Sequence, residues 1–318
     1  MRKIVRKIKD IIKSNKRLYK LIINALSEYG YLKLKLNTII HGDKYMISRR
    51  YKQVFGREID FKNPKALTEK IQWLKVYGFE KFHTVVTDKY AARDWLAERF
   101  GSEYLIPLLF KTNNYKDIKP ENIPEFPCII KPNNGSGSIH IVRDKNLADW
   151  DIISESLKLS AKHNYYYYGN ERQYKNIKPL FIAEKLLQTK AGKIPNDYKL
   201  HFINGKLEFV YCTIDREGAN YRKNYTPDWQ PLPFDWSSPN PDKSKIKTGP
   251  DIPPPVSYSK MREIGSEIAK LFKYIRVDFY DVDGRLYYGE VTIHHGSGYD
   301  VFIPEKYDYI YGEKLKLN

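Results

Sequence analysis

The chain has 318 residues, 42% of them hydrophobic and 14% aromatic, which is enough for a packed core in two or three subdomains. Its two cysteines, Cys128 and Cys212, exclude a disulfide framework and a four-cysteine zinc site, and both lie in apolar runs typical of reduced core residues. There is no run of about 18 apolar residues to span a bilayer, and the first twenty residues are too charged for a signal peptide. We therefore expect a cytoplasmic protein.

The net charge of +17 is concentrated near the N-terminus. Residues 1–40 hold eleven Lys or Arg against two acids, so they carry +9 of the total. Over residues 1–26 apolar side chains recur at helical spacing between the basic ones, which predicts a basic amphipathic helix suited to an anionic membrane surface. The alternative is a helix packed on its own domain with a solvated basic face. We find no RNA-binding or zinc-finger signature, so nucleic acid is not an expected partner.

The first half of the chain alternates helical patterns with strand patterns. A turn leading into a helix is predicted over 61–77, with Thr68 as the N-cap. Another helix is predicted over 87–101, with Thr87 or Asp88 as its cap and Gly101 as its stop. The elements that follow are a glycine-rich hairpin (126–142), a helix (147–163), a polar and aromatic loop (164–179) and a strand (180–188).

The second half contains two strong hairpin patterns. The first spans 198–216 across an Asn-Gly turn, and the second spans 275–294 across Asp283-Gly284. Between them lie a long surface loop (224–257) and a helix (258–274). Antiparallel hairpins mixed with helices predict an α+β fold rather than a regular βαβ series.

Asp278 and Glu290 face each other across the second predicted hairpin. If Gly284 takes the left-handed position of a three-residue loop with a bulge, both carboxylates lie on one face, together with Arg276 and Thr292. Two adjacent carboxylates repel unless a cation joins them, and oxygen-only ligands suit Mg²⁺. A two-residue loop would turn one carboxylate away, and an ordinary solvent-facing strand pair is the alternative.

The glycine-rich turn of the first hairpin has the features of an anion site. Consecutive N–H groups in such a turn make a concave nest, Lys131 adds a charge beside it, and the hydroxyls of Ser136 and Ser138 can donate. The turn is not a Walker A loop, because no GxxxxGK[ST] occurs. A bare glycine-rich hairpin is often only a turn, but an acid pair elsewhere in the chain favours a phosphate site.

These motifs, in their order, resemble the ATP-grasp pattern: Lys89 within "DKYAARDWL", then "IIKPNNGSGS", "AEKLL" and "RVDF…GEVT". More narrowly, "PKALTEKIQWLK", "ERQYKNIKPLFIAEKLL", "DYKLHFINGK" and "GEVTIHHGSGYD" resemble the TupA-like ATP-grasp proteins of bacterial cell-surface polysaccharide clusters. The resemblance covers about residues 50 to 318. It implies an ATP-grasp fold in which two α+β subdomains grip ATP.

The basic N-terminus lies outside the resemblance, which implies a division of the rest of the chain and a set of site residues. The expected regions are a basic helical extension (1–45), a helical region (46–115), a small ATP-grasp subdomain with a glycine-rich lid (116–185) and a C-terminal subdomain with the Mg²⁺ site (186–318). The residues that it assigns to ATP are Lys89, Lys131, Ser136, Gly137, Ser138, Glu184, Lys185, Leu187, Asp197 and Lys199. Those assigned to metal are Asp278 and Glu290, with Arg276 and Lys131 catalytic and His294, His295, Gly296 and Ser297 near substrate.

Within that set the resemblance implies particular roles. Glu184 would take the adenine amino group, and Arg276 would steady the transferring phosphoryl group. Thr292 stands where many ATP-grasp enzymes have an Asn ligand, so its role is open. For His294 and His295, a surface position without function is the alternative to substrate contact. Residues 133–138 and 164–176 are the candidate lids; the tyrosine run in the second also suits a sugar-stacking surface or an ordinary packed loop.

The implied activity is an ATP-dependent carboxylate–amine ligation through an acyl phosphate. The expected substrates are a uronic-acid carboxylate of a surface polysaccharide, or of its lipid-linked precursor, and an amino acid or other amine. Three alternatives stay open: a glycosyltransferase using Asp281 and Asp283 as a DxD motif, a non-catalytic basic polysaccharide- or membrane-binding module, and an ATP-dependent kinase on the same scaffold.

Overall fold

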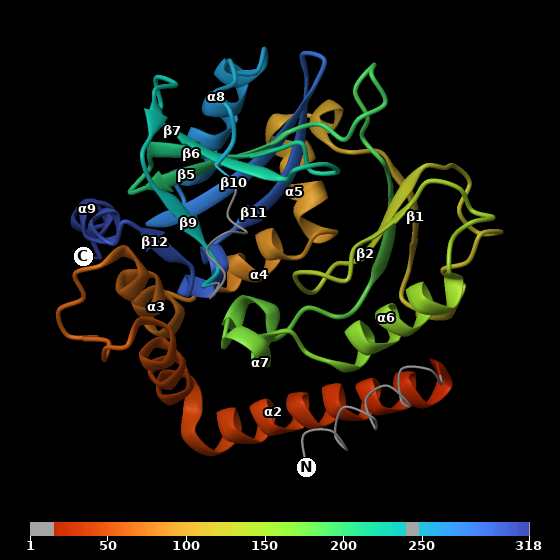
Figure 1. Cartoon of the computed structure of the whole chain (residues 1–318), viewed down its shortest axis with the longest axis horizontal. Helices are drawn as coiled ribbons and strands as arrows, with labels where there is room; N and C mark the ends of the chain where they lie inside the picture. Colours follow the sequence, from red (N-terminus) through yellow and green to blue (C-terminus); the bar gives the residue numbers. More distant parts are fainter. Residues whose placement is uncertain (1–15, 240–247, 318) are drawn as a thin grey trace, which may run out of the picture.

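A computed structural model of the chain describes residues 16–239 and 248–317. Two β-sheets face each other in its upper part, and a long N-terminal helix lies beneath them (Figure 1). Most of the predicted amphipathic helix, residues 1–15, lies outside the described residues. Every helix within the described ranges is too short or too polar to cross a lipid bilayer.

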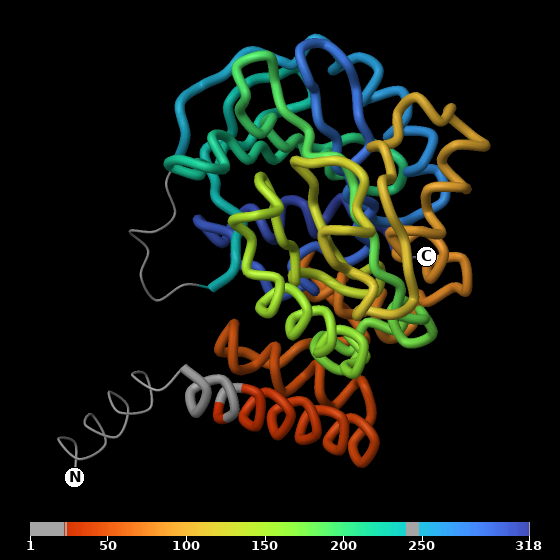
Figure 2. Tube along the Cα trace, turned by 90° about the vertical axis from the view of Figure 1, so that its right-hand side faces the viewer, coloured from red at the N-terminus to blue at the C-terminus, as the bar shows by residue number. Residues whose placement is uncertain are grey.

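Helix α2 (Lys16–Phe55) is bent rather than straight, because Gly42 has non-helical backbone angles (φ 78°, ψ 168°). Glycine reaches a positive φ without steric cost, so it allows one helical run to change direction here. The first run lies along the bottom of the molecule, and the second rises toward α3 (Leu67–Tyr77) (Figure 1). The view in Figure 2, turned by 90°, shows the same helix below the body of the molecule.

The predicted helices of this region exist, with two corrections. The helix predicted to follow a turn within 61–77 begins at Leu67, and its N-cap is Ala66, not Thr68. Thr68 is buried instead, and its hydroxyl donates to Asp308 Oδ2 (2.6 Å). The helix predicted over 87–101 is α5 (Ala91–Phe100), which begins later than predicted and has Gly101 as the expected stop; the short helix before it, α4 (Lys81–Thr87), was not predicted.

The four-stranded small sheet has the order β1-β4-β2-β3, with all neighbours antiparallel. Its strands are β1 (Leu108–Thr112), β2 (Cys128–Pro132), β3 (His140–Val142) and β4 (Phe181–Lys185). Alternate side chains, such as Cys128 and Ile130, pack under helix α6 (Trp150–Lys162), while Ile129 and Lys131 point to the opposite face. Cys128 and Cys212 are both free and buried, as predicted.

The six-stranded large sheet has the order β11-β10-β5-β6-β7-β8. Its strands are β5 (Asp197–Ile203), β6 (Lys206–Ile214), β7 (Tyr221–Tyr225), β8 (Pro231–Leu232), β10 (Tyr274–Val282) and β11 (Arg285–Thr292). Both predicted hairpins, β5–β6 and β10–β11, are confirmed. Helix α8 (Tyr258–Ala269) packs on one face with Leu200, Val277 and Phe279, so the residues between these on β5 and β10 face the small sheet.

Shorter elements complete the fold. The segment predicted as a loop over 164–179 contains α7 (Tyr166–Gly169), and the long loop predicted over 224–257 contains β8 and β9 (Asp235–Ser237). Strand β12 (Val301–Ile303) pairs with β9, and helix α9 (Lys306–Lys314) packs on α3 through a second core that includes Leu67 and Trp236.

Candidate functional site

The uncovered faces of the two sheets enclose a cavity of about 160 Å³, which we call the inter-sheet cavity. Its walls come from β2, β3 and β4 on one side and from β5, β10 and β11 on the other. Part of the lining is apolar, including Ile129, Ile141 and Leu187. The rest is charged and comprises Lys89, Lys131, Glu184, Lys185, Asp197, Lys199, Arg216, Asp278 and Glu290. Most of the residues predicted to hold ATP and metal are therefore brought together in one place.

Asp278 and Glu290, the acid pair, are direct partners in the β10–β11 register. The prediction was right about the pair but wrong about the turn. The connection is the two-residue turn Asp283-Gly284, both with positive φ, rather than a three-residue loop. A bulge at Gly289, between the pairs Phe279–Tyr288 and Asp278–Glu290, restores the shared face.

The bulge at Gly289 reverses the alternation of strand β11. Before it, Leu286 and Tyr288 join the core under α8, and after it Val291 and Ile293 do so. Without the extra residue, Glu290 would have pointed into that core. The bulge thus turns the carboxylate into the cavity. A Cβ at position 289 would lie 3.0 Å from the carbonyl oxygen of Asp278, which explains why glycine fits there.

Arg276 joins the two carboxylates of the acid pair. Its Nε donates to Asp278 Oδ1 (2.6 Å), and its Nη2 donates to Asp278 Oδ2 and to Glu290 Oε1 (2.7 Å each). Partial burial alone would raise the pKa of Glu290, but Lys89 and Arg276 outweigh it and lower the pKa to about 2. Glu290 is therefore a carboxylate at any physiological pH.

Lys131 and Glu184 form an ion pair on the small sheet, with Lys131 Nζ 2.5 Å from Glu184 Oε2. Arg93 of α5 holds the other oxygen, Oε1, at 2.8 Å. Both oxygens of the residue predicted to take the adenine amino group thus have cationic partners. Arg93 was missed in the sequence, where nothing but its position four residues after Lys89 marks it.

Lys89 lies in the turn between α4 and α5 and reaches the glycine loop, residues 133–138. Its Nζ donates to the carbonyl of Gly135 (2.6 Å) and lies 3.8 Å from Glu290 Oε2. Burial lowers the pKa of this lysine. Asn133, which the sequence did not single out, holds the loop by donating to Asp88 Oδ1 (2.9 Å) and accepting from the backbone N–H of Leu180 (2.8 Å). The loop's first residues are buried, and 136–139 are exposed.

Asp197 and Lys199, whose roles the resemblance left open, extend the charged cluster on β5. Lys199 pairs with Asp197 and with Asp278 Oδ2 (3.1 Å), and Arg216 donates to Asp197 Oδ2 (3.0 Å). Asp197 Oδ1 is buried and has no hydrogen-bond partner in the described chain.

The donor chemistry of this cluster fits Mg²⁺ only with help from a ligand. Within residues 16–239 and 248–317, no three or more His, Cys, Asp and Glu side chains are placed to hold a metal by themselves. The acid pair supplies carboxylate oxygens, and Glu290 Oε2 accepts no hydrogen bond from the described residues. Mg²⁺ commonly binds through one or two carboxylates and completes its shell with phosphate oxygens and water.

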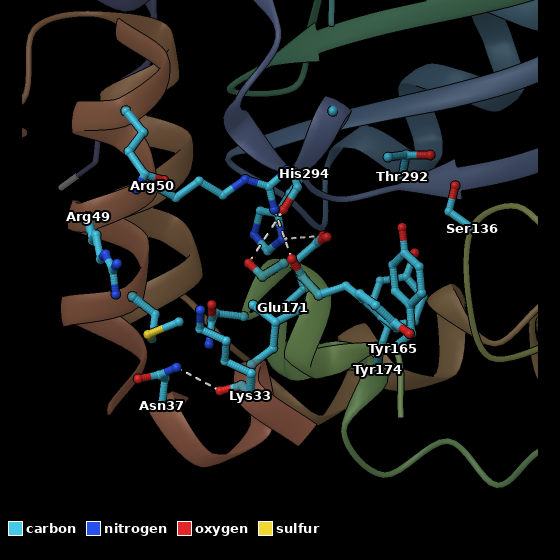
Figure 3. A pocket seen from close by; sticks show the side chains of 18 of the residues that line it. Lys33, Asn37, Arg49, Arg50, Ser136, Tyr165, Glu171, Tyr174, Thr292 and His294 are labelled. Carbon is cyan, nitrogen blue, oxygen red and sulfur yellow. Dashed lines mark hydrogen bonds and ion pairs between the residues drawn. The ribbon is translucent and has the colours of Figure 1, made fainter. Parts of the chain in front are cut away.

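A second and larger cavity, of about 640 Å³, lies between α2, the 164–174 segment and the end of β11 (Figure 3). We call it the α2 cavity. Glu290 lines both cavities, and Arg276 and Thr292 line the α2 cavity beside it. The acid pair therefore stands at the junction of the two spaces.

The residues predicted to contact substrate, 294–297, divide into two groups. Neither histidine is on the surface: both are buried, so the alternative of a surface position is wrong. His294 lines the α2 cavity, where its Nδ1 is hydrogen-bonded to Gln173 Nε2 (3.1 Å) and lies 3.4 Å from Glu171 Oε2. Burial lowers the pKa of His294. His295 points elsewhere: its Nδ1 contacts Arg276 Nη1 at 2.9 Å.

Gly296 and Ser297 line the α2 cavity and are held from behind by α3. Lys75 donates to the Ser297 carbonyl (2.9 Å) and hydroxyl (3.1 Å), and Gln72 donates to the carbonyls of Ser297 and Gly298. Burial lowers the pKa of Lys75 to about 7. Gln72 and Lys75 both lie within the quoted motif "PKALTEKIQWLK", but neither was assigned a role from the sequence.

The second candidate lid, residues 164–176, is packed against α2. The backbone N–H of Asn164 donates to the Tyr31 hydroxyl (3.0 Å), and Arg172 Nε donates to Asp43 Oδ2 (2.9 Å). Tyr166 is buried and also hydrogen-bonds to Asp43. The tyrosine run is thus a packed segment, of which Tyr165 and Tyr168 line the α2 cavity.

The DVD sequence at 281–283 serves the hairpin rather than a cavity. Asp281 accepts from the backbone N–H groups of Gly284 (2.7 Å) and Ser257 (2.8 Å), and Asp283 accepts from that of Lys190 (2.7 Å). Neither aspartate lines the inter-sheet or the α2 cavity. This arrangement speaks against the DxD alternative.

Two unlike antiparallel sheets that close on one charged cavity, with a lysine and a glycine loop on the smaller sheet, define the ATP-grasp class of proteins. A model of the TupA-like ATPgrasp family matches residues 69–316. The chain belongs to this family, and the predicted α+β ATP-grasp fold is confirmed. Helix α2 lies before the matched region. No curated protein matches the sequence.

Several solved structures are similar to this chain at low identity. D-alanine–D-alanine ligase from Bacillus anthracis is 15% identical (TM-score 0.39), with 69% of this chain and 62% of that one covered. L-amino acid ligase from Bacillus licheniformis is 12% identical (TM-score 0.42; 91% and 62% covered). D-alanine–D-alanine ligase from Helicobacter pylori is 16% identical (TM-score 0.39; 78% and 69% covered). The chain thus spans less than two thirds of the length of the first two.

Proposed function

We propose that the protein is an ATP-dependent carboxylate–amine ligase, with ATP in the inter-sheet cavity and the carboxylate and amine in the α2 cavity. The observation that carries this proposal is the position of Glu290, which lines both spaces. A phosphoryl group leaving a nucleotide in one cavity would meet a carboxylate in the other beside the acid pair and Arg276. Membership of the TupA-like ATP-grasp family supports the same assignment.

The proposed reaction has two steps. A carboxylate oxygen takes the γ-phosphoryl group of ATP, which forms an acyl phosphate and releases ADP. The amine then attacks the carbonyl carbon, and a C–N bond forms. The C–O bond to phosphate breaks, phosphate leaves with the electron pair, and the amine nitrogen loses one proton, which the departing phosphate or water takes up. The first step makes a poor electrophile reactive, and it depends on positioning and charge more than on covalent chemistry by the protein.

The charged residues have distinct parts in this scheme. Lys89 and Lys131 would bind phosphate oxygens; for Lys131 this means exchanging its ion pair with Glu184 for one with the nucleotide. Arg276 would stabilise the transferring phosphoryl group from the α2 cavity side. Mg²⁺ bound to the acid pair would offset charge on the phosphates. The apolar residues Ile129, Ile141 and Leu187 would pack against the adenine, next to the backbone of 185–187.

For the substrate we propose a uronic-acid carboxylate of a surface polysaccharide or its lipid-linked precursor, joined to an amino acid or other amine. The α2 cavity, at about 640 Å³, has room for more than one sugar ring. Its Tyr165 and Tyr168 side chains offer rings for stacking, and the net charge of +17 suits a polyanionic glycan.

We further propose that the protein works at the inner face of the cytoplasmic membrane. Helix α2 exposes an apolar stripe formed by Leu26, Tyr29, Leu32, Leu36, Ile39 and Ile40. These residues recur mostly at three- and four-residue intervals. The segment that precedes the stripe in the sequence, residues 1–20, is rich in Lys and Arg. An apolar helix face next to basic residues is the pattern of helices that lie on anionic lipid surfaces.

The reaction is tested by ADP release over a panel of amino acids with a uronic-acid acceptor, read together with the product mass. Ligation should give ADP and a product lighter by one water than its two parts. Asp278→Asn and Glu290→Gln should abolish it, and Asp281→Asn and Asp283→Asn should leave turnover in place. The opposite pattern would favour the glycosyltransferase, and a stable phosphorylated product formed without amine would favour the kinase.

A further inference from the structure

The bend in α2 gives the α2 cavity a wall made of two helical runs. Lys33 and Asn37 line it from the run before Gly42, and Arg49 and Arg50 line it from the run after, as Figure 3 shows. Met46, Arg49, Arg50 and Gln53 share one helix face by their spacing. A straight helix could not have presented both sets to the same space.

This wall is fixed to the body of the molecule at the bend. Asp43, the residue after the bend, holds Arg172 and Tyr166, and Asn170 Nδ2 donates to the Thr38 hydroxyl (3.1 Å). Tyr31 stacks on His163 with ring centroids 4.1 Å apart. Polar and aromatic contacts on both runs therefore hold the cationic side chains at a defined place relative to the acid pair.

The charges on this wall are not balanced by the protein. Within the described chain, Arg49 and the Lys33 ammonium have no hydrogen-bond or ion-pair partner. Arg50 donates to the Tyr168 carbonyl (2.8 Å) and stacks over the Tyr299 ring, which fixes its position without cancelling its charge. Of the two acids that line the cavity, Glu171 is paired with His294 and Gln173, and Glu290 with Arg276.

We propose that Lys33, Arg49 and Arg50 form a subsite for a second anionic group of the carboxylate substrate, a phosphate or a further carboxylate. This inference rests on the proposed function, in which the reacting carboxylate lies at Arg276. Guanidinium groups bind either anion through paired hydrogen bonds. The subsite would select substrates with two separated acidic groups, such as a uronic acid that also carries a phosphate or a neighbouring uronic acid. It lies outside the part of the chain that the family model matches.

The test compares three probes that differ in their second anion: glucuronic acid, glucuronic acid 1-phosphate and digalacturonic acid. Binding is measured calorimetrically in the presence of ADP and Mg²⁺, so that no turnover is needed. The full-length protein should bind one or both doubly anionic probes roughly tenfold more tightly than glucuronic acid, the size of one charge-assisted interaction. Tighter binding of glucuronic acid 1-phosphate indicates a preference for phosphate, and tighter binding of digalacturonic acid indicates a preference for a second carboxylate.

The variant Arg49→Gln should remove most of this gain and leave glucuronic acid binding unchanged, and Arg49→Lys should keep part of it. Arg262→Gln, at an exposed position on α8, changes the net charge equally and should have no effect. The inference is overturned if wild type does not distinguish the probes, or if Arg49→Gln weakens all three alike. If the preference holds while ADP release fails with every amine, the subsite stands and the proposed ligation is wrong.

Discussion

Arg276 is the side chain on which both carboxylates of the acid pair depend. Asp278 is buried and meets Arg276 through two hydrogen bonds, so removing the arginine would leave a buried carboxylate with Lys199 as its remaining cation. Such losses are costly, because a buried charge without its partner keeps its desolvation penalty. In the proposed mechanism the same residue therefore has a structural and a catalytic role, and a fall in activity on its loss would not separate the two.

Lys131 offers a cleaner test of the nucleotide assignment. In the variant Lys131→Ala, Glu184 keeps Arg93 as an ion-pair partner, so we expect a folded protein with nearly the same melting temperature. ADP release should fall by two or more orders of magnitude, because a cation that binds phosphate is gone. Circular dichroism and an ADP-release assay check the two statements. If Lys131→Ala released ADP at the wild-type rate, with acceptor and amine both saturating, the proposed role of Lys131 would be contradicted.

Lys75 predicts a pH dependence of stability. Its pKa is lowered from 10.5 to about 7 in the folded protein, because burial penalises the ammonium. Between pH 7 and 10.5 the unfolded chain thus binds more protons at this residue, and stability should rise with pH, by at most about 1.4 kcal/mol per pH unit. Below pH 7 both states are protonated and this slope vanishes. Urea unfolding should show that the free energy of unfolding rises more from pH 7 to pH 9 in wild type than in Lys75→Met. Equal rises in the two proteins would contradict the lowered pKa of Lys75.

At the scale of elements, the β10–β11 hairpin shows what the sequence could predict and what it could not. Strand alternation and the Asp-Gly turn identified the hairpin, and the distance between Asp278 and Glu290 suggested a shared face. The predicted turn length was wrong, and the two carboxylates share a face only because a bulge at Gly289 shifts the register of β11. Bulge position depends on how β11 packs against α8 and β10, which are tertiary contacts that no local pattern encodes.

Residues with long-range partners were the ones that sequence reasoning misjudged. Thr68 had the composition of an N-cap but bonds to Asp308, 240 positions away. His294 and His295 lie in a polar run, yet the packing of Glu171 and Asp300 against them makes both buried. The orientation of the motif residues on strands was easier to predict, because successive side chains of a strand point to opposite faces of the sheet.

We predict that Gly289→Ala disturbs the acid pair. The added Cβ would lie 3.0 Å from the Asp278 carbonyl oxygen and 3.1 Å from the Tyr280 ring, so the bulge must shift. Overpacking of this kind costs roughly 1–3 kcal/mol, and ADP release should fall at least tenfold as Glu290 moves. Thermal melting and the ADP assay measure both. Gly30→Ala in α2, where the new Cβ meets open space, is the control: it should leave ADP release unchanged and should not lower the melting temperature, because alanine favours a helix interior over glycine. Unchanged activity in Gly289→Ala would argue against a functional bulge.

At the scale of the whole molecule, α2 forms the base of the structure (Figure 2). The apolar stripe is exposed on this helix. The stripe continues along the run before Gly42, where the opposite side of the helix carries buried Tyr31 and Thr38. Exposed apolar area of this length on one helix indicates an interaction surface.

The variant Leu36→Gln/Ile39→Gln/Ile40→Gln should sediment less with anionic vesicles than wild type, and its ADP release with soluble substrates should be unchanged. Leu147→Gln, which removes a leucine outside α2 that is more exposed than any of these three residues, is the control. Salt should weaken the wild-type interaction, since basic residues contribute to it. Identical sedimentation of the triple variant and wild type would remove the membrane proposal.

The thickness of α2 sets a limit on how far a substrate has to travel. One helix is about 10 Å across with its side chains, and the same run that carries the apolar stripe contributes Lys33 and Asn37 to the α2 cavity. If the stripe rests on lipid, the α2 cavity lies within about one helix diameter of the headgroups. A sugar attached to a lipid carrier would then reach the acid pair while its hydrocarbon tail stayed in the bilayer.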